Sequence, residues 1–279
     1  MHGRNAAVAR RYYPGYRPPK QAYQEVLDQQ VQSDTSWLDI GCGRRVCADK
    51  TLNRLLPRRA RLTVGCDRDP YISGHSSVRN LVLCDAAALP FRNGVFSLVS
   101  ASMVLEHLED PEAVFREVAR VSQPGGRFVV FTPNRYNYAM LVAAVTPHRF
   151  HVLWRKFTHY LARGQWRDFG ADLFPTWYRA NSASCLRSLL SRTAFKEERV
   201  QYLSLAHSFG FVRPLYVLSL LLERAIHRCG FHILKADILA VFVHDGRAHT
   251  LGQGQGDGGA SRPASSGVAA WNGRGADGV

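Results

Sequence analysis

Residues 36–46 read SWLDIGCGRRV, an apolar run that ends in two alternate glycines, Gly41 and Gly43. This pattern is typical of a buried strand that turns tightly beneath a ligand at the edge of an open sheet. A dinucleotide-binding turn carries a third glycine for close helix packing, and Val46 occupies that position here. The stretch therefore predicts a ligand-binding turn and argues against a dinucleotide.

Around this turn, short apolar runs alternate with helix-like segments. Residues 111–121 have apolar side chains at helical spacing and are followed by residues 123–126 (QPGG), a helix stop signal. A further helix is expected to begin at Ser182. Runs that are apolar on both faces indicate parallel strands covered by helices, so we expect a doubly wound α/β fold. The expected strands are residues 36–40, 61–66, 80–84, 95–101, 127–132, 198–203 and 233–243.

Two of the expected strands end in a carboxylate. Asp67 closes the second strand, where it can accept hydrogen bonds from both hydroxyls of a ribose. Asp85 closes the third strand and precedes Ala86, which suits the exocyclic amine of adenine beside an apolar floor. The alternatives are a helix cap for Asp67 and an Asx turn for Asp85.

Five motifs follow one another in the order and spacing of a known family: LDIGCG (38–43), VGCD (64–67), CDAAALPF (84–91), VLEHLEDP (104–111) and VSQPGGRFVVFTPN (121–134). Together they resemble the class I S-adenosylmethionine-dependent methyltransferases, in the small-molecule branch that includes quinone and glycan methyltransferases. The resemblance covers about residues 36–134. It implies S-adenosylmethionine as cofactor and a Rossmann-like sheet of seven strands, mostly parallel with an antiparallel last strand, with helical cap insertions.

The resemblance also implies a set of cofactor-binding residues in the glycine turn and at the strand ends. This set is Asp39, Gly41, Cys42, Gly43, Asp67, Asp85, Ala86 and Ser102. Gly41 and Gly43 would let the backbone approach the methionine part, Asp67 would hold the ribose, and Asp85 with Ala86 would frame the adenine. Asp39 would steady the turn or hold the methionine ammonium through water.

Four positions near this site leave alternatives open. Arg45 stands where the family often has a further glycine. Arg44 or Arg45 would reach the methionine carboxylate or face water. Ser100 and Ser102, around the end of the fourth strand, would line the pocket or pack within a loop.

His107 is the candidate general base. Methyl transfer from a sulfonium needs alignment, exclusion of water and, for a hydroxyl acceptor, a group that takes the proton. His107 follows the fourth strand, and its pKa range suits this role. The alternative for His107 is a structural or cofactor-lining residue, and Glu106 is expected to hydrogen-bond the fold. No carboxylate cluster supports a metal site, so none is expected.

Acceptor specificity is expected in two irregular segments, residues 135–180 and 206–231. Interleaved aromatic, arginine and histidine side chains in the first suit a sugar, phosphate-bearing or aromatic acceptor. Short pieces of it resemble methyltransferases of surface-polysaccharide and lipid-linked glycan synthesis. We therefore expect O-methylation of a small-molecule, glycan or lipid-linked acceptor. The alternatives are an RNA-binding methyltransferase and a cofactor-binding protein without transfer activity. Ser100 stands where methyltransferases of base amines have Asn or Asp before two prolines, which disfavours nucleic acid as acceptor.

The net charge of +14 indicates an attraction to anionic partners. Residues 1–20 are basic and are expected to form a flexible arm, residues 21–245 the methyltransferase domain, and residues 246–279, rich in Gly, Ala and Ser, a disordered tail. Six cysteines without a CxxC pair indicate buried thiols in a reducing compartment.

We expect a cytoplasmic protein, since no apolar secretory segment follows the first charges. The leucine-rich stretch at residues 209–222 lies beside Arg213, Arg224 and Arg228 and has the composition of an interfacial helix. Peripheral membrane contact is therefore the alternative to a buried helix or a dimer face. The sequence does not predict an oligomeric state.

Overall fold

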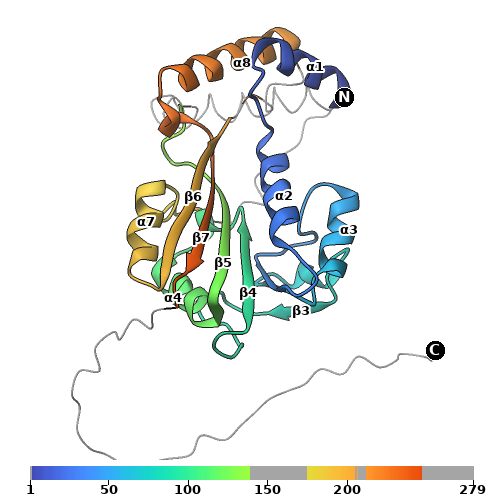
Figure 1. Ribbon diagram of the computed structural model, residues 1–279, viewed down its shortest axis with the longest axis vertical. Helices are drawn as coiled ribbons and strands as arrows, with labels where there is room; N and C mark the ends of the chain where they lie inside the picture. Colours follow the sequence, from blue (N-terminus) through green and yellow to red (C-terminus); the bar gives the residue numbers. More distant parts are fainter. Residues whose placement is uncertain (1, 139–174, 205, 207–211, 247–279) are drawn as a thin grey trace, which may run out of the picture. The chain divides into compact units, whose positions relative to one another are not determined.

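The computed structural model describes residues 2–138, 175–204, 206 and 212–246, and its central element is a seven-stranded sheet (Figure 1). The strand order is β3-β2-β1-β4-β5-β7-β6. Neighbours from β3 to β5 are parallel, whereas β7 runs antiparallel to both β5 and β6. The predicted Rossmann-like sheet is confirmed. Its strands are β1 (Ser36–Ile40), β2 (Leu62–Asp67), β3 (Asn80–Leu83), β4 (Phe96–Ser102), β5 (Ser122–Pro133), β6 (Phe195–Leu203) and β7 (Asp237–His244).

The strand order reverses beside β1, whose neighbours are β2 on one side and β4 on the other. All five residues of β1 are buried, as the continuous apolar run predicts. Ligands of open parallel sheets bind outside the carboxyl ends of the strands at such a reversal. The turn after Ile40 and the segment after Ser102 therefore flank the expected ligand position.

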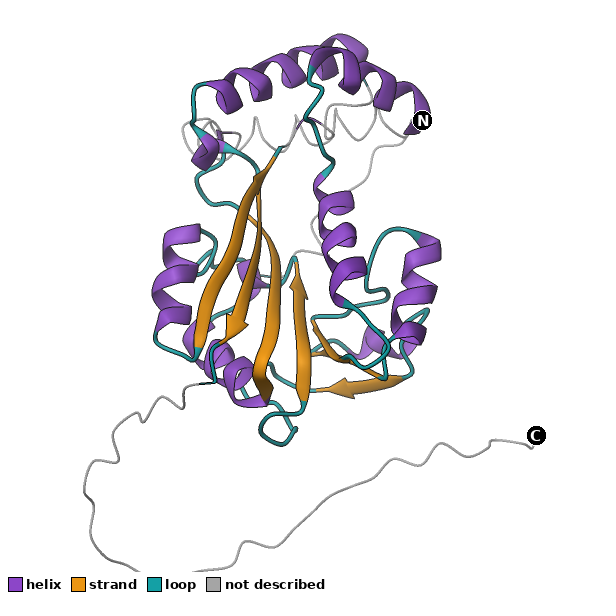
Figure 2. Ribbon diagram, in the orientation of Figure 1, coloured by secondary structure: helices purple, strands orange, loops and turns teal. Residues whose placement is uncertain are grey.

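Helices cover both faces of the sheet (Figure 2). Side chains of adjacent strand residues point to opposite faces, so Trp37 and Leu38 enter different cores. Trp37 and Val129 pack with α2 and α3, and Leu38 and Val130 pack with α4 and α7. These helices are α2 (Pro19–Gln30), α3 (Lys50–Arg59), α4 (Pro111–Val121) and α7 (Ala183–Ser191).

The sequence predicts α4 with its observed bounds. Asp110 caps the helix by accepting a hydrogen bond from the Ala113 amide, and Pro111 occupies the first turn, where its missing N–H costs nothing. The last strand begins later than predicted because η4 (His232–Leu234) occupies the start of the expected 233–243 run.

The segment predicted to be a flexible arm, residues 1–20, contains a helix, α1 (His2–Tyr12). This helix packs against α8 (Arg213–Arg228). The contact is apolar and buries Ala9, Tyr13, Ala206, Tyr216 and Leu220. A short polar helix gains its stability from tertiary packing, and the partner of this one lies at the other end of the chain.

The two ends of the first predicted insertion, residues 135–180, lie side by side at the end of β5. Arg135 donates its amide hydrogen to the Asn181 carbonyl (2.8 Å), and the Asn181 side chain donates to Thr132 Oγ1 (2.7 Å) and to the Pro133 carbonyl (3.1 Å). Asn181 is fully buried. Residues 139–174, the body of the insertion predicted at 135–180, lie outside the described residues.

The chain divides into two units, Met1–Ala248 and His249–Val279. The tail predicted to be disordered lies outside the described residues from 247 onward. None of the helices in the described ranges is long and apolar enough to cross a bilayer.

Candidate active site

A cavity of about 1000 Å³ opens at the carboxyl ends of β1, β2 and β4. Six residues that the sequence predicts for the site line this cavity together: Gly41, Gly43, Asp67, Asp85, Ala86 and His107. They come from separate turns, which meet because the strand order reverses here. Three further predicted residues, Asp39, Cys42 and Ser102, are not among the lining residues.

The glycine turn approaches the segment after β4 so closely that Gly41 has no room for a side chain. Its φ is +64°, and a Cβ at this position would lie 2.2 Å from Val104 Cγ2. Gly43 has a φ of +49°, which also favours glycine, but open space lies around it. The amides of Gly41 and Cys42 both donate to the Cys66 carbonyl, which ties the turn to β2.

Asp67 joins the glycine turn to the cavity. One carboxylate oxygen accepts a hydrogen bond from the Gly43 amide (3.0 Å), and the other accepts one from the Asp69 amide (3.1 Å). Each carboxylate oxygen has two lone pairs, so both retain an acceptor site toward the cavity. The side chain therefore fixes the turn and can also bind a hydroxyl group.

Asp39 lies in a buried network instead of the cavity wall. Ser100 donates to Asp39 Oδ1 (2.5 Å) and accepts from Trp37 Nε1 (2.7 Å). Burial raises the pKa of Asp39 to about 7. Tyr23, which the sequence analysis did not identify, places its hydroxyl in this region, where it is buried and has no hydrogen-bond partner among the described residues. Asp39 thus links β1 to β4, and Ser100 belongs to this network and not to the pocket.

Asp85 forms the Asx turn that the sequence offered as the alternative, and it also lines the cavity. Its Oδ1 accepts a hydrogen bond from the Ala87 amide (2.9 Å), which forms the Asx turn, while the residue also lines the cavity. Arg68 Nε lies 3.7 Å from its other oxygen in a solvent-exposed ion pair. Such exposed pairs contribute little to stability. Ala86 is buried and forms part of the wall.

Tyr71 lines the cavity, and Arg44 lies against its ring. The Arg44 guanidinium lies over the Tyr71 ring, 5.3 Å from its centre, and Tyr71 is 67% exposed and lines the cavity. Arg45 is exposed. Tyr71 was missed from sequence because it sits in a short 3-10 turn, η1 (Pro70–Gly74), without hydrophobic periodicity.

Met103 is another lining residue that the sequence did not reveal. It adopts a φ of 56°, which is rare for a residue with a side chain. Its amide donates to the Phe131 carbonyl (2.7 Å), which holds this conformation beside the sheet. Strained backbone of this kind is characteristic of binding sites, where the surrounding structure enforces it.

His107 lines the cavity in η2 (Leu105–His107), as predicted. Its Nδ1 lies 2.8 Å from the Pro175 carbonyl oxygen, which can only accept a hydrogen bond, so Nδ1 carries the hydrogen. In the neutral ring, Nε2 then has the lone pair. Trp177 also lines the cavity, and its amide donates to the Glu106 carbonyl (2.7 Å), so the chain after the insertion is anchored at η2.

Glu106 is buried behind His107 and is not part of the wall. Thr132 donates to Glu106 Oε2 (3.4 Å), and burial raises the pKa of this carboxyl group. Glu106 Oε1 lies 3.9 Å from His107 Nε2. Among the described residues, no three side chains of metal-ligating type converge on a point.

Comparison with known proteins gives a family match over the central part of the chain. A family model described as a methyltransferase domain matches residues 38–130. The chain is 34% identical over 109 residues to a demethylmenaquinone methyltransferase of Mycolicibacterium paratuberculosis, a match that covers 38% of this chain and 40% of that protein. It is 33% identical over 111 residues to the ubiquinone/menaquinone biosynthesis C-methyltransferase UbiE of Photorhabdus laumondii, covering 40% and 41%.

Solved structures show the same fold. An S-adenosylmethionine dependent methyltransferase from Mesorhizobium loti has a TM-score of 0.51 at 17% identity, with 81% of this chain and 98% of that chain covered. The sequence matches are shorter, and the chain spans about two fifths of the length of the curated relatives that it matches.

Proposed function

From the match of residues 38–130 to a methyltransferase domain, we propose that the protein transfers a methyl group from S-adenosylmethionine to a small-molecule acceptor. The observation that carries the proposal is the cavity in which the glycine turn meets Asp67 and Asp85. Its volume of about 1000 Å³ is at the upper end of small-molecule sites. The cavity can therefore admit S-adenosylmethionine together with part of an acceptor.

The residues present fit the cofactor. Asp67 has acceptor sites left for the ribose hydroxyls, and Asp85 with Ala86 offers a polar edge beside an apolar wall for the adenine. The turn at Gly41 gives backbone access for the methionine part. The Asp39 carboxylate lies one residue before the Ile40–Gly41 turn and is held by Ser100, so its proposed role is to steady this turn.

The bound cofactor supplies an electrophilic methyl group on a sulfonium. The contribution of this chain is to align the acceptor, exclude water and remove a proton. We assign proton removal to Nε2 of His107, because the Pro175 carbonyl fixes the ring in the tautomer that leaves this nitrogen basic. The buried Glu106 carboxyl group lies 3.9 Å from this nitrogen.

The acceptor atom is proposed to be oxygen, with His107 taking the hydroxyl proton as the oxygen attacks the methyl carbon and the carbon–sulfur bond breaks. A carbon acceptor is the second candidate, because one curated relative above is named a demethylmenaquinone methyltransferase and the other a ubiquinone/menaquinone biosynthesis C-methyltransferase. The same base serves both reactions, since removing a phenolic proton also activates the neighbouring ring carbon. A glycan or lipid-linked acceptor would be recognised by the insertion at 135–180.

We propose that α8 provides peripheral contact with an anionic membrane surface. Leu218, Leu221 and Leu222 are 63%, 44% and 45% exposed, while the other face of the helix is buried. Exposed leucines between two exposed arginines, Arg213 and Arg228, are typical of an interfacial helix. Such contact would bring a lipid-soluble acceptor to the protein.

Cofactor binding is tested by calorimetry with S-adenosylhomocysteine. Asp67→Asn should weaken binding by about 1–3 kcal/mol, because charge-assisted hydrogen bonds to the ribose are lost. Asp34→Asn, which removes the same charge from an exposed loop, is the matched control and should bind like the wild type. No detectable binding by the wild type would overturn the proposed function.

The acceptor is tested by transfer of a labelled methyl group into a cell extract and into model hydroquinones, with NMR of the product to distinguish an O-methyl from a C-methyl group. His107→Gln should lose transfer while keeping cofactor affinity. Label recovered in RNA would favour the RNA-methyltransferase alternative, and cofactor binding without any transfer would favour the binding-protein alternative.

A further inference from the structure

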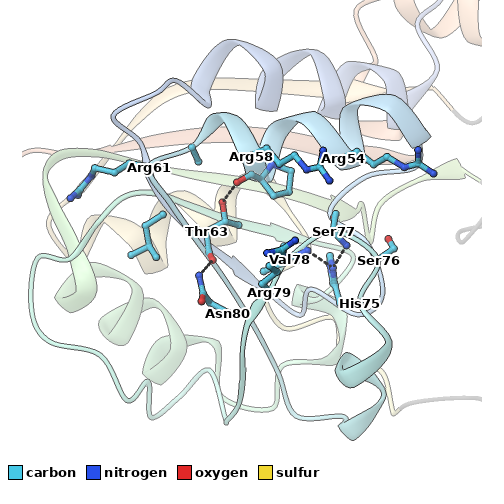
Figure 3. A pocket seen from close by; sticks show the side chains of 13 residues that line it. Arg54, Arg58, Arg61, Thr63, His75, Ser76, Ser77, Val78, Arg79 and Asn80 are labelled. Carbon is cyan, nitrogen blue, oxygen red and sulfur yellow. Dashed lines mark hydrogen bonds between the residues drawn. The ribbon is translucent and has the colours of Figure 1, made fainter. Parts of the chain in front are cut away.

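A second cavity, of about 610 Å³, lies at the amino ends of β2 and β3, on the edge of the sheet opposite to the cofactor cavity (Figure 3). Three segments form its walls: the C-terminal half of α3, the start of β2, and the loop of residues 75–79 before β3. We call this cavity the arginine groove. Nothing in the proposed methyl transfer uses it.

The groove is strongly basic. Its lining contains four arginines and no aspartate or glutamate. Figure 3 shows Arg54 and Arg58 along one helix, with Arg79 on the loop below them and Arg61 toward the far end of the groove. All four arginines are exposed, and their like charges gather around one cavity, which attracts an anion.

These charges are not neutralised within the described part of the chain. The guanidinium groups of Arg54, Arg58 and Arg79 have no ion pair and no hydrogen bond to any described residue. Arg61 donates only to neutral oxygens, the Ser36 hydroxyl and the Asp34 backbone carbonyl. Arg59, adjacent to Arg58 but directed away from the groove, pairs with Asp28. The protein therefore pairs the neighbouring arginine and leaves three guanidinium groups at the groove available.

The loop of the groove is fixed and carries neutral hydrogen-bonding groups. His75 Nδ1 accepts from the amides of Ser77 (3.2 Å) and Val78 (3.0 Å), so Nε2 carries the hydrogen of the neutral ring. Burial lowers the pKa of His75, which favours that neutral form. His75 Nε2 and Ser77 Oγ are both buried without a partner among the described residues. Beneath them, Leu62 and Val78 provide an apolar floor.

We propose that the arginine groove binds a small ligand that carries two or more phosphate groups. Guanidinium groups match phosphate oxygens in bidentate geometry, and several arginines around one cavity suit adjacent phosphates better than a single carboxylate. The volume is that of a small-molecule site, and an apolar floor suits the organic part of a phosphate ester. An extended nucleic acid would instead require a continuous basic surface with aromatic stacking positions.

The test is calorimetric titration of the full chain with inorganic triphosphate at physiological ionic strength. The wild type should bind, and Arg58→Gln/Arg79→Gln should weaken binding by at least about tenfold, because two charge-assisted contacts are lost. Arg116→Gln/Arg199→Gln removes the same charge from exposed positions on α4 and β6 and should bind like the wild type. If the first variant unfolds, Arg54→Gln/Arg79→Gln replaces it.

Three results would overturn the proposal: wild-type affinity in both groove variants, displacement of triphosphate by S-adenosylhomocysteine, or binding only of RNA or of anionic vesicles. Displacement by S-adenosylhomocysteine would place the triphosphate in the cofactor cavity. Undisturbed triphosphate binding with no S-adenosylhomocysteine binding would refute the proposed function and leave the groove intact, so the two failures are distinguishable.

Discussion

At the scale of single residues, Gly41 is the position where the cofactor turn admits no side chain. Gly41→Ala must displace Val104 from the cavity wall and hold an alanine at a φ of +64°. We expect a loss of about 1–3 kcal/mol in stability and at least a tenfold (about 1.4 kcal/mol) loss of S-adenosylhomocysteine affinity. Urea unfolding and calorimetry measure the two effects. Gly74→Ala, where open space surrounds an ordinary backbone, should change neither, and unchanged affinity in Gly41→Ala would refute this account of the turn.

Asp39 carries a prediction about pH. Its pKa is raised by burial from 3.8 to about 7, so the folded protein keeps a proton that the unfolded chain has released. The contribution of Asp39 to the free energy of unfolding therefore falls as the pH rises from about 4 to about 7. Asp39→Asn removes this titration, and urea unfolding across that range should show a smaller decline than in the wild type. Asp34→Asn should keep the wild-type decline; equal declines in Asp39→Asn and the wild type would contradict the assignment.

The sequence predicts those site residues whose role follows from chain position. Gly41 follows β1, Asp67 ends β2 and Asp85 follows β3, so motif spacing places them at one edge of the sheet. Tyr71 and Trp177 reach the same cavity from irregular segments, and no periodic pattern marks them. For Asp39, Cys42 and Ser102, spacing gives the correct neighbourhood but not the direction of the side chain.

At the scale of elements, the packing of α1 on α8 predicts a sharp difference between two leucines of one helix. Leu220 is fully buried against α1, whereas Leu218 is 63% exposed. Leu220→Ala should cost about 2–5 kcal/mol in the free energy of unfolding, because it leaves a cavity. Leu218→Ala should stay within about 0.5 kcal/mol of the wild type. Equal effects in urea unfolding would show that α8 does not pack as described.

The packing of α1 on α8 could not be predicted from the sequence. Local sequence is enough to predict the strands and α4. Continuous apolar runs indicate the strands, and the capping Asp110 with a proline in the first turn indicates α4. The stability of α1 instead depends on Tyr216 and Leu220, which lie far along the chain. The basic, polar sequence of α1 therefore predicts a flexible arm unless its packing partner, α8, is known.

At the scale of the whole molecule, membrane contact through α8 is measurable by sedimentation with anionic vesicles. Leu218→Ser/Leu222→Ser should lower the bound fraction at least about tenfold, because two side chains no longer enter the lipid interface. Leu55→Ser, an exposed leucine on α3, is the matched control and should bind like the wild type. Equal binding by the double variant would remove the membrane proposal.

The hydrogen bonds that join Arg135 and Thr132 to Asn181 have a consequence for how the sequence between them can change during evolution. Because the chain leaves the sheet at Arg135 and returns beside the same point, the distance between the two ends stays fixed whatever the intervening length. Lengthening a loop whose ends are already joined adds little free energy, since the closure term grows only slowly with loop size. Insertions, deletions and exchanges between residues 139 and 174 can therefore accumulate while the sheet and cofactor turn remain unchanged. Such changes leave the joined ends at Arg135 and Asn181 in place.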